Sequence, residues 1–418
     1  MMKKNEERIA NGFVWNILGL TFNNFNSLFF LVIVKRINGI EVAGVFAYGY
    51  AVACFLYVFS LFYNRAFQIS NEHISDKAYV FSRLVFCGLS FVLSCFVALF
   101  SSQTLFKFLT IVGLCLFRNL EAASDVFQGI AHKNNRLDYA GKSLFVKSFL
   151  GLVIFWLVDY LTKRAELAVC ALATLNFFGL IFDWLYVKTH FVLNQGSKKD
   201  IALILKSATP ILIFSALGML LLNMQKYLIG LFHEDSFGTI FNILVMPATI
   251  MSLCSQYLIN PFMNIMAKAL NECNHRAFFK IVMNLSIALI LIGLFVCFAA
   301  KIFGIRLMEI VYDMSLVGYA YLILLVIFSS SFYALVQLFS SALTVMGKNF
   351  MQPFLYAVSA VAGGALSVLF MKRDVVAGAL YGYAISMLVL FVLYMFVFFV
   401  QVRRIQGEKS EIKTFHNL

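Results

Sequence analysis

Three charged residues inside one long apolar stretch are the first sign of chemistry in this sequence. Arg118, Glu121 and Asp125 are spaced three and four residues apart, which places them on one face of a helix. A charge at the bilayer centre costs about 2.5–3.5 kcal/mol on insertion scales, so this face is expected to point away from lipid. Two interpretations remain open: Arg118 and Glu121 form an internal ion pair, or the face lines a hydrated cavity. Asp125, which lacks an obvious local partner, favours the cavity.

Two further cations, Lys226 and Arg65, are candidates for binding an anion. Lys226 lies deep in the apolar stretch 207–232, with no acidic residue within a turn or two. We expect it to pair with Glu121 or Asp125 of another helix, or to meet an anionic ligand. Arg65 follows the apolar stretch 42–63 and is expected either at a cavity mouth on the cytoplasmic side or as an interfacial anchor.

Neutral and acidic polar residues give weaker signals. Asn16 and Asn23 share a helix face and are candidates for contacting sugar hydroxyls, although hydrogen bonding between helices is the commoner use of such residues. Asp159 and Asp183 fall near the ends of apolar stretches, beside Lys163 and Trp184. These two acids are expected to be ordinary interface residues.

Metal, cofactor and enzymatic chemistry have no support in the sequence. No two histidines have ligand spacing, and the eight cysteines contain no CxxC pair. Phosphate-binding, dinucleotide-binding and hydrolase motifs are also missing from the sequence. We therefore predict no catalytic residue, no metal and no cofactor, and a transporter is expected instead of an enzyme.

The elements that must position these residues are transmembrane helices. The chain has 418 residues, of which 62% are hydrophobic and 13% charged, against roughly 45–50% and 25% in soluble domains. Apolar stretches of the length a bilayer requires recur along nearly the whole chain. They predict about twelve spans, at 12–34, 42–63, 80–101, 104–130, 143–162, 166–187, 207–232, 237–262, 281–300, 316–345, 350–371 and 376–400.

The charge pattern predicts orientation and excludes a nucleic-acid partner. The net charge is +13, but the basic residues lie in short segments between spans instead of on one basic face. Most of them fall on the side of the amino terminus, so both termini are predicted to be cytoplasmic. The predicted protein is an all-α, multi-pass membrane protein.

Two halves of six spans each are expected. The polar segment from Asn194 to Asp200 separates residues 1–195, an N-terminal six-helix lobe, from residues 196–418, a C-terminal six-helix lobe. A short similarity links Glu41–Phe46 with Asp235–Phe241, each joining the first two spans of its half. Repeats of the same orientation are related by a pseudo-two-fold axis along the membrane normal and place the substrate at their interface.

Several motifs resemble one family of exporters. The most specific is Asp125-Val-Phe-Gln-Gly-Ile-Ala-His-Lys133, which is similar to the Phe-Gln-Gly segment of Wzx-type O-antigen and polysaccharide flippases of the multidrug/oligosaccharidyl-lipid/polysaccharide exporter superfamily. Looser similarities are Asn16-Ile-Leu-Gly19, Gly39-Ile-Glu-Val-Ala-Gly44, Lys226-Tyr-Leu-Ile-Gly230 with Gly238, and Gly378-Ala-Leu-Tyr-Gly382. Many relatives have an acid directly before the basic residue of the seventh span, where this sequence has Gln225.

The resemblance implies a function in surface polysaccharide assembly. It implies transport of an undecaprenyl-pyrophosphate-linked oligosaccharide to the outer leaflet of a bacterial inner (cytoplasmic) membrane. Arg118, Lys226 and Arg65 would bind the head group, while Glu121 or Asp125 would couple an ion or form ion pairs. The partners would be this substrate, membrane lipid and a polysaccharide polymerase. The alternatives are a multidrug/cation antiporter of the same superfamily, which would be expected to have an acid in its first, seventh or eighth span, and a membrane glycan polymerase.

Overall fold

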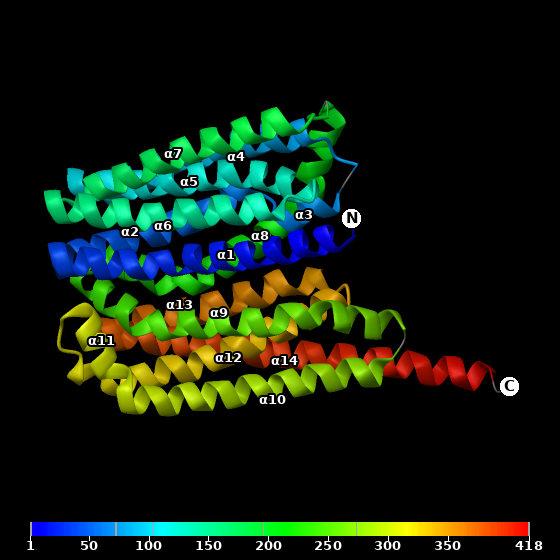
Figure 1. The fold of residues 1–418 in the computed structure, drawn as a ribbon. Coiled ribbons are helices and arrows are strands. Elements are labelled where there is room, and N and C mark those ends of the chain that lie inside the picture. Colours follow the sequence, from blue (N-terminus) through cyan, green and yellow to red (C-terminus); the bar gives the residue numbers. More distant parts are fainter. Residues whose placement is uncertain (1, 72, 103, 195, 273, 417–418) are drawn as a thin grey trace. The chain divides into compact units, whose positions relative to one another are not determined.

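The computed structural model describes residues 2–71, 73–102, 104–194, 196–272 and 274–416, and all regular structure among them is helical (Figure 1). The first part of the chain forms α1 (Met2–Asn38), α2 (Ile40–Leu61), α3 (Arg65–Ser70), α4 (Asp76–Ser101), α5 (Leu105–Lys133), α6 (Leu137–Thr162) and α7 (Ala165–His190). The second part forms α8 (Lys198–Phe232), α9 (Asp235–Asn271), α10 (His275–Ala299), α11 (Ile305–Tyr312), α12 (Ala320–Val345), α13 (Gln352–Met371) and α14 (Val375–His416). A π-helical turn (Ala300–Gly304) precedes α11, and 3₁₀ turns precede α12 (Val317–Tyr319) and α13 (Asn349–Met351).

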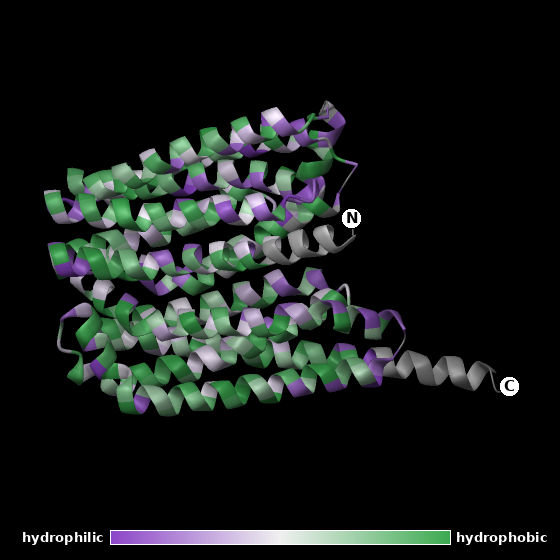
Figure 2. Ribbon diagram, viewed as in Figure 1, coloured by the Kyte–Doolittle hydropathy of each residue, from purple (hydrophilic) through white to green (hydrophobic). Residues whose placement is uncertain are grey.

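The helices confirm a multi-pass membrane protein. Eleven helical segments of the described chain are long and apolar enough to cross a bilayer. Figure 2 shows hydrophobic residues over most of the helix lengths and hydrophilic residues gathered toward the helix ends. The predicted span 104–130 falls on α5, which is not one of the eleven because it carries Lys107, Arg118, Glu121, Asp125 and Lys133. Its 29 residues would extend about 43 Å, enough to cross a hydrocarbon core of about 30 Å.

The chain forms two compact units. Unit 1 contains Met1–Met219 and Ile229–Thr239, and unit 2 contains Leu220–Leu228 and Ile240–Leu418. The chain therefore changes units twice within α8 and once within α9. The division expected between residues 195 and 196 stays a prediction, and Gln195 itself lies outside the described residues.

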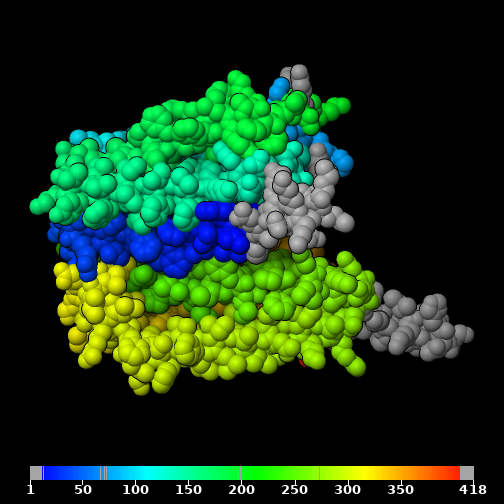
Figure 3. All heavy atoms as spheres, viewed as in Figure 1, coloured from blue at the N-terminus to red at the C-terminus, as the bar shows by residue number. Residues whose placement is uncertain are grey.

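Unit 1 is built around α5. This helix packs against α2, α4, α6 and α7 and contacts the short α3. Small residues permit the close approach: a Cβ atom at Gly129 would overlap the side chain of Gln68 of α3, and one at Gly113 would press on Val169 of α7. On the face of unit 1 turned to the viewer in Figure 3, α1, α6 and α7 form the surface. The charged helix is thus enclosed by the apolar ones, which removes most of its charges from lipid.

Unit 2 is held together by close packing of α13 with α14 and of α12 with α10 and α14. A Cβ atom at Gly363 would overlap the Ser386 hydroxyl, and one at Gly382 would overlap the Ser367 hydroxyl. Small residues at such crossings are the usual means of bringing membrane helices together.

The turn between α8 and α9 belongs to unit 1 and packs against α2 and α5. Lys107 Nζ lies 2.7 Å from Asp235 Oδ1, and the Thr239 hydroxyl donates a hydrogen bond of 2.6 Å to the carbonyl oxygen of Ile40. A Cβ atom at Gly44 would overlap the carbonyl oxygen of Asp235. The two short segments that resemble each other in sequence, Glu41–Phe46 and Asp235–Phe241, therefore pack directly together.

Replacing Gly44 with alanine is expected to destabilise the protein by roughly 1–3 kcal/mol, the usual cost of overpacking. The obstacle is a backbone carbonyl, which no side-chain rotation can move. The matched control is Gly88→Ala in α4, where the added methyl group meets nothing within 4 Å and alanine gains up to about 1 kcal/mol of helix propensity. The measurement is the midpoint of thermal unfolding in detergent, and equal midpoints for the two variants would contradict this packing.

Candidate functional site

Arg118 and Glu121 form an ion pair in unit 1. Arg118 Nη1 lies 2.6 Å from Glu121 Oε2, and these side chains are 12% and 8% exposed. Arg118 Nη2 also donates to the hydroxyl of Tyr50, and Asn23 Nδ2 donates to Glu121 Oε1 at 2.7 Å. Of the two interpretations of this helix face, the internal ion pair is therefore present. Asn23 takes part in hydrogen bonding between helices.

Asp125 has partners that its own helix does not supply. Arg65 Nε, at the start of α3, donates to Asp125 Oδ1 at 3.0 Å, and Arg65 Nη2 also bonds Gln128 Oε1 at 2.8 Å. Arg83 Nη2, from α4, lies 3.6 Å from Asp125 Oδ2. The predicted head-group residue Arg65 and the predicted coupling residue Asp125 are thus brought together.

Asp183 is a buried ion-pair partner, so the prediction that it is an interface residue is wrong. Its side chain is 1% exposed, and its Oδ2 lies 2.8 Å from Lys147 Nζ of α6. The hydroxyls of Tyr139 and Ser143 donate to Oδ1 at 2.9 and 2.7 Å. Asp159 is buried as well and accepts a hydrogen bond of 2.7 Å from Asn38 Nδ2. Nearness to the end of an apolar stretch misled the prediction, because the helix face, and not depth alone, decides burial.

These groups form one cluster along α5 with an excess of positive charge. We call it the α5 charge cluster; its members are Arg65, Arg83, Arg118, Lys147, Glu121, Asp125 and Asp183. Four cations face three carboxylates, because Asp125 is shared by two arginines. The cluster as described therefore carries one net positive charge inside an apolar unit.

Arg83 carries much of this excess. It is fully buried, and its Nε and Nη1 have no hydrogen-bond partner among the described residues. Its guanidinium lies 4.2 Å from the centroid of the Tyr63 ring. Arg83 and Lys147 are functional candidates that were not predicted from the sequence. Their positions inside the apolar stretches 80–101 and 143–162 were the available signal.

Two residues in the wall of a cavity in unit 1 contact guanidinium groups of the α5 charge cluster. The cavity has a volume of about 230 Å³ and is lined by residues of α2, of the turn after α2 and of α8: Tyr57, Val58, Leu61, Phe62, Tyr63, Asn64, Ile211, Leu212, Ser215 and Met219. The Arg118 guanidinium lies 5.4 Å from the centroid of the Tyr57 ring, and Arg83 stacks on Tyr63. Two wall residues of the cavity thus each contact a cation of the α5 charge cluster.

The remaining predicted site residues lie elsewhere. Lys226 is a half-buried residue of α8 in unit 2, next to the buried Gln225, whose Nε2 lies 3.4 Å from Ser367 Oγ. Glu121 and Asp125 have their partners within unit 1, so the expected pairing of Lys226 with either is not needed to neutralise them. Asn16 lies in α1 where its backbone closely approaches Gly141 of α6. No group of three metal-ligating side chains occurs in the described part of the chain.

Solved structures with the same arrangement of helices are transporters. A multidrug resistance MATE family transporter of the MOP superfamily, in an inward-facing conformation, matches 94% of this chain and 99% of its own, with a TM-score of 0.62 at 13% identity. This chain has the MATE fold. A mutant of the Vibrio cholerae MATE transporter VcmN matches 96% of this chain and 98% of its own, with a TM-score of 0.62 at 12% identity.

Two further similarities bear on function within the MATE fold. A MOP superfamily transporter from Pyrococcus furiosus, described as having a binding pocket of reverse polarity, matches 96% of this chain and 97% of its own, with a TM-score of 0.51 at 13% identity. The capsular polysaccharide biosynthesis protein CapF of Staphylococcus aureus is 24% identical over 241 residues, which span 54% of this chain and 59% of CapF. No protein-family model matches the chain. The MATE fold and the likeness to CapF confirm the resemblance that the sequence motifs indicate.

Proposed function

We propose that this protein is a flippase that moves an undecaprenyl-pyrophosphate-linked oligosaccharide from the cytoplasmic to the outer leaflet of a bacterial inner membrane. The observation that carries the proposal is the net positive charge of the α5 charge cluster beside a cavity. A diphosphate cannot cross hydrocarbon without groups that replace its hydration, and guanidinium groups do so with paired hydrogen bonds. The likeness to CapF, a capsular polysaccharide protein, supports the same class of substrate.

The membrane potential would drive such transport in the proposed direction. With the cell interior negative, moving about two negative charges outward gains about 4.6 kcal/mol per 100 mV. In this proposal both termini are cytoplasmic, Arg118, Lys226 and Arg65 bind the head group, and Asn16 and Asn23 contact the glycan. Glu121 and Asp125 neutralise the cations between transport cycles or couple an ion. A polysaccharide polymerase is the proposed partner that consumes the product.

A multidrug/cation antiporter is the second candidate, because the MATE structures with this fold include multidrug transporters. Its substrate would be a cation and would need an available carboxylate. In unit 1, Glu121, Asp125 and Asp183 are each engaged by a cation of the protein. The expected spans 12–34, 207–232 and 237–262 contain no acidic residue. Proteoliposomes that translocate a lipid-linked oligosaccharide but no lipophilic cation would favour the flippase; the reverse result would establish the antiporter.

Lys226→Ala is expected to lower oligosaccharide translocation in proteoliposomes at least tenfold, since a half-buried cation that meets the head group is lost. Lys226→Arg should keep much of the rate because the charge remains. The matched control is Lys206→Ala, which removes an exposed cation from the same helix and should leave the rate unchanged. A normal rate for Lys226→Ala would remove this residue from the proposed binding site.

A further inference from the structure

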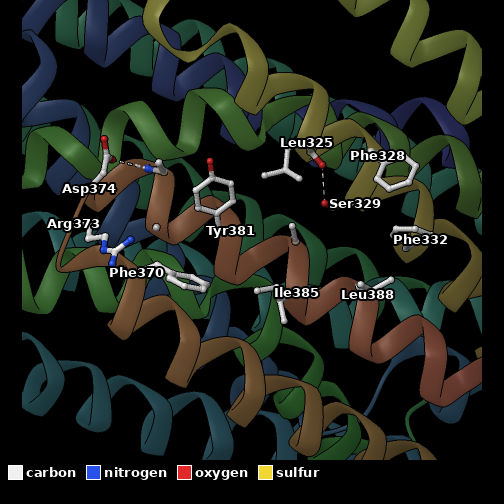
Figure 4. Close-up of a pocket in the computed structure, with 13 residues that line it drawn as sticks. Leu325, Phe328, Ser329, Phe332, Phe370, Arg373, Asp374, Tyr381, Ile385 and Leu388 are labelled. Atoms are coloured by element: carbon white, nitrogen blue, oxygen red, sulfur yellow. Dashed lines mark hydrogen bonds between the residues drawn. The ribbon is translucent and has the colours of Figure 1, made fainter.

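A long apolar groove crosses the surface of unit 2. It has a volume of about 560 Å³ and lies along α12 and α14, with the turn between α13 and α14 at one end. Figure 4 shows Arg373 and Asp374 at one end, Tyr381 and Ile385 in the middle, and Leu388 and Phe332 at the other end. The lining side chains Phe328, Tyr381 and Leu388 are 55%, 40% and 43% exposed. The groove is therefore open along its length.

The groove follows two helices of membrane-spanning length. Both helices that line it belong to the apolar segments Val317–Val345 and Val375–Arg404, which are long enough to cross a membrane. Water does not fill an apolar groove in hydrocarbon, so a lipid chain is the chemistry that fits its walls. The turn at its end corresponds to the side predicted to face outward.

One end of the groove carries an excess of positive charge. Lys372 and Arg373 are exposed there, beside the exposed Asp374. Asp374 Oδ1 accepts a hydrogen bond of 2.8 Å from the backbone amide of Ala377, so this carboxylate is occupied in capping α14. Lys372 and Arg373 therefore exceed Asp374 by one positive charge. They lie at the start of α14, where the helix dipole also favours a negatively charged ligand. A lipid with a phosphate head group matches this end.

The groove follows α14 deep into its apolar part. It extends from the turn before Val375 to Leu388, fourteen residues of helix or about 20 Å. One leaflet contributes about 15 Å of the hydrocarbon core, half of its thickness of about 30 Å. A polyprenyl chain is long enough to reach the deep end at Phe332 and Leu388.

We propose that this groove holds the tail of a polyprenyl phosphate or diphosphate lipid, with its phosphate at Arg373 and its chain along Tyr381, Ile385 and Leu388. The proposal rests on the proposed function for the identity of the lipid. It assigns unit 2 the task of holding the apolar part of the substrate.

The test is the binding of undecaprenyl phosphate, which carries no glycan, to the full-length purified protein, measured by native mass spectrometry in detergent. Ala384→Trp fills the middle of the groove without changing charge, and Arg373→Glu reverses the charge at its end. Each is expected to lower the bound fraction at least fivefold. Arg373 is exposed, so its variant tests the site even where the tryptophan variant fails to fold.

Two controls match these changes in kind. Leu291→Trp adds the same ring at a 60% exposed position of α10, and Lys301→Glu reverses an exposed cation in the π-helical turn after that helix. Both should bind undecaprenyl phosphate as the natural protein does. Wild-type binding by Arg373→Glu, or by a folded Ala384→Trp variant, would overturn the proposal. Equal competition by phosphatidylglycerol would also overturn it, in favour of a phospholipid occupant.

Failure of the groove and failure of the flippase function give different results. If undecaprenyl phosphate binds and the groove variants lose it, the groove is supported even where proteoliposomes translocate no oligosaccharide. If oligosaccharide is translocated but the groove variants bind undecaprenyl phosphate as the natural protein does, the flippase function is supported and the lipid site in the groove is refuted.

Discussion

Arg118→Ala is expected to stop translocation of lipid-linked oligosaccharide, with a loss of at least a hundredfold, while the protein remains inserted in the membrane. The change removes the guanidinium that contacts the cavity-lining Tyr57 and leaves Glu121 as an uncompensated carboxylate, 8% exposed. The α5 charge cluster then loses its net positive charge, and the unpaired Glu121 carboxylate repels a diphosphate. The measurements are initial rates in proteoliposomes and surface glycan in cells that depend on this protein.

A second variant separates this effect from loss of stability. Breaking a buried ion pair costs roughly 3–5 kcal/mol because one charge is left unpaired. In the double variant Arg118→Ala/Glu121→Gln both charges are gone, so stability should recover while transport stays lost. Arg118→Lys should retain part of the rate. Normal transport in the double variant would show that Arg118 serves only to neutralise Glu121.

Asp183→Ala should have the largest effect on stability, lowering the free energy of unfolding by roughly 3–5 kcal/mol. It leaves the Lys147 ammonium, whose side chain is 10% exposed, without its carboxylate. It also removes the acceptor of Tyr139 and Ser143. The measurement is thermal unfolding in detergent, in which the fraction of protein that remains monodisperse after heating is recorded.

The control for Asp183 is an ion pair with an exposed partner on the same helix. Arg164 Nε lies 2.7 Å from Glu166 Oε1, and the Arg164 side chain is 62% exposed. Glu166→Ala should cost no more than about 1 kcal/mol, because solvent screens such a pair. The double variant Lys147→Met/Asp183→Leu should recover part of the stability lost in Asp183→Ala, since apolar groups often replace a buried pair without loss. A loss in Asp183→Ala no greater than in Glu166→Ala would mean that the buried pair is not needed.

The sequence by itself determined the membrane-spanning helices and which residues share a face within one helix. Apolar stretches of bilayer length predict the spans, because a bilayer accepts little else, and each predicted span falls on a long helix. A spacing of three residues puts Arg118 and Glu121 on one face, and the structure joins them. Both conclusions need only local geometry, which a single segment contains.

The partners across helices were decided only by the tertiary structure. Asp125 meets Arg65 and Arg83 from positions 60 and 42 residues earlier in the chain, and Asp183 meets Lys147 of another helix. The spacing of residues along one helix does not determine which neighbouring helix, or which of its faces, will contact them. That depends on how all the helices pack together. The excess charge of the α5 charge cluster, the cavity beside it and the groove on unit 2 are products of that packing.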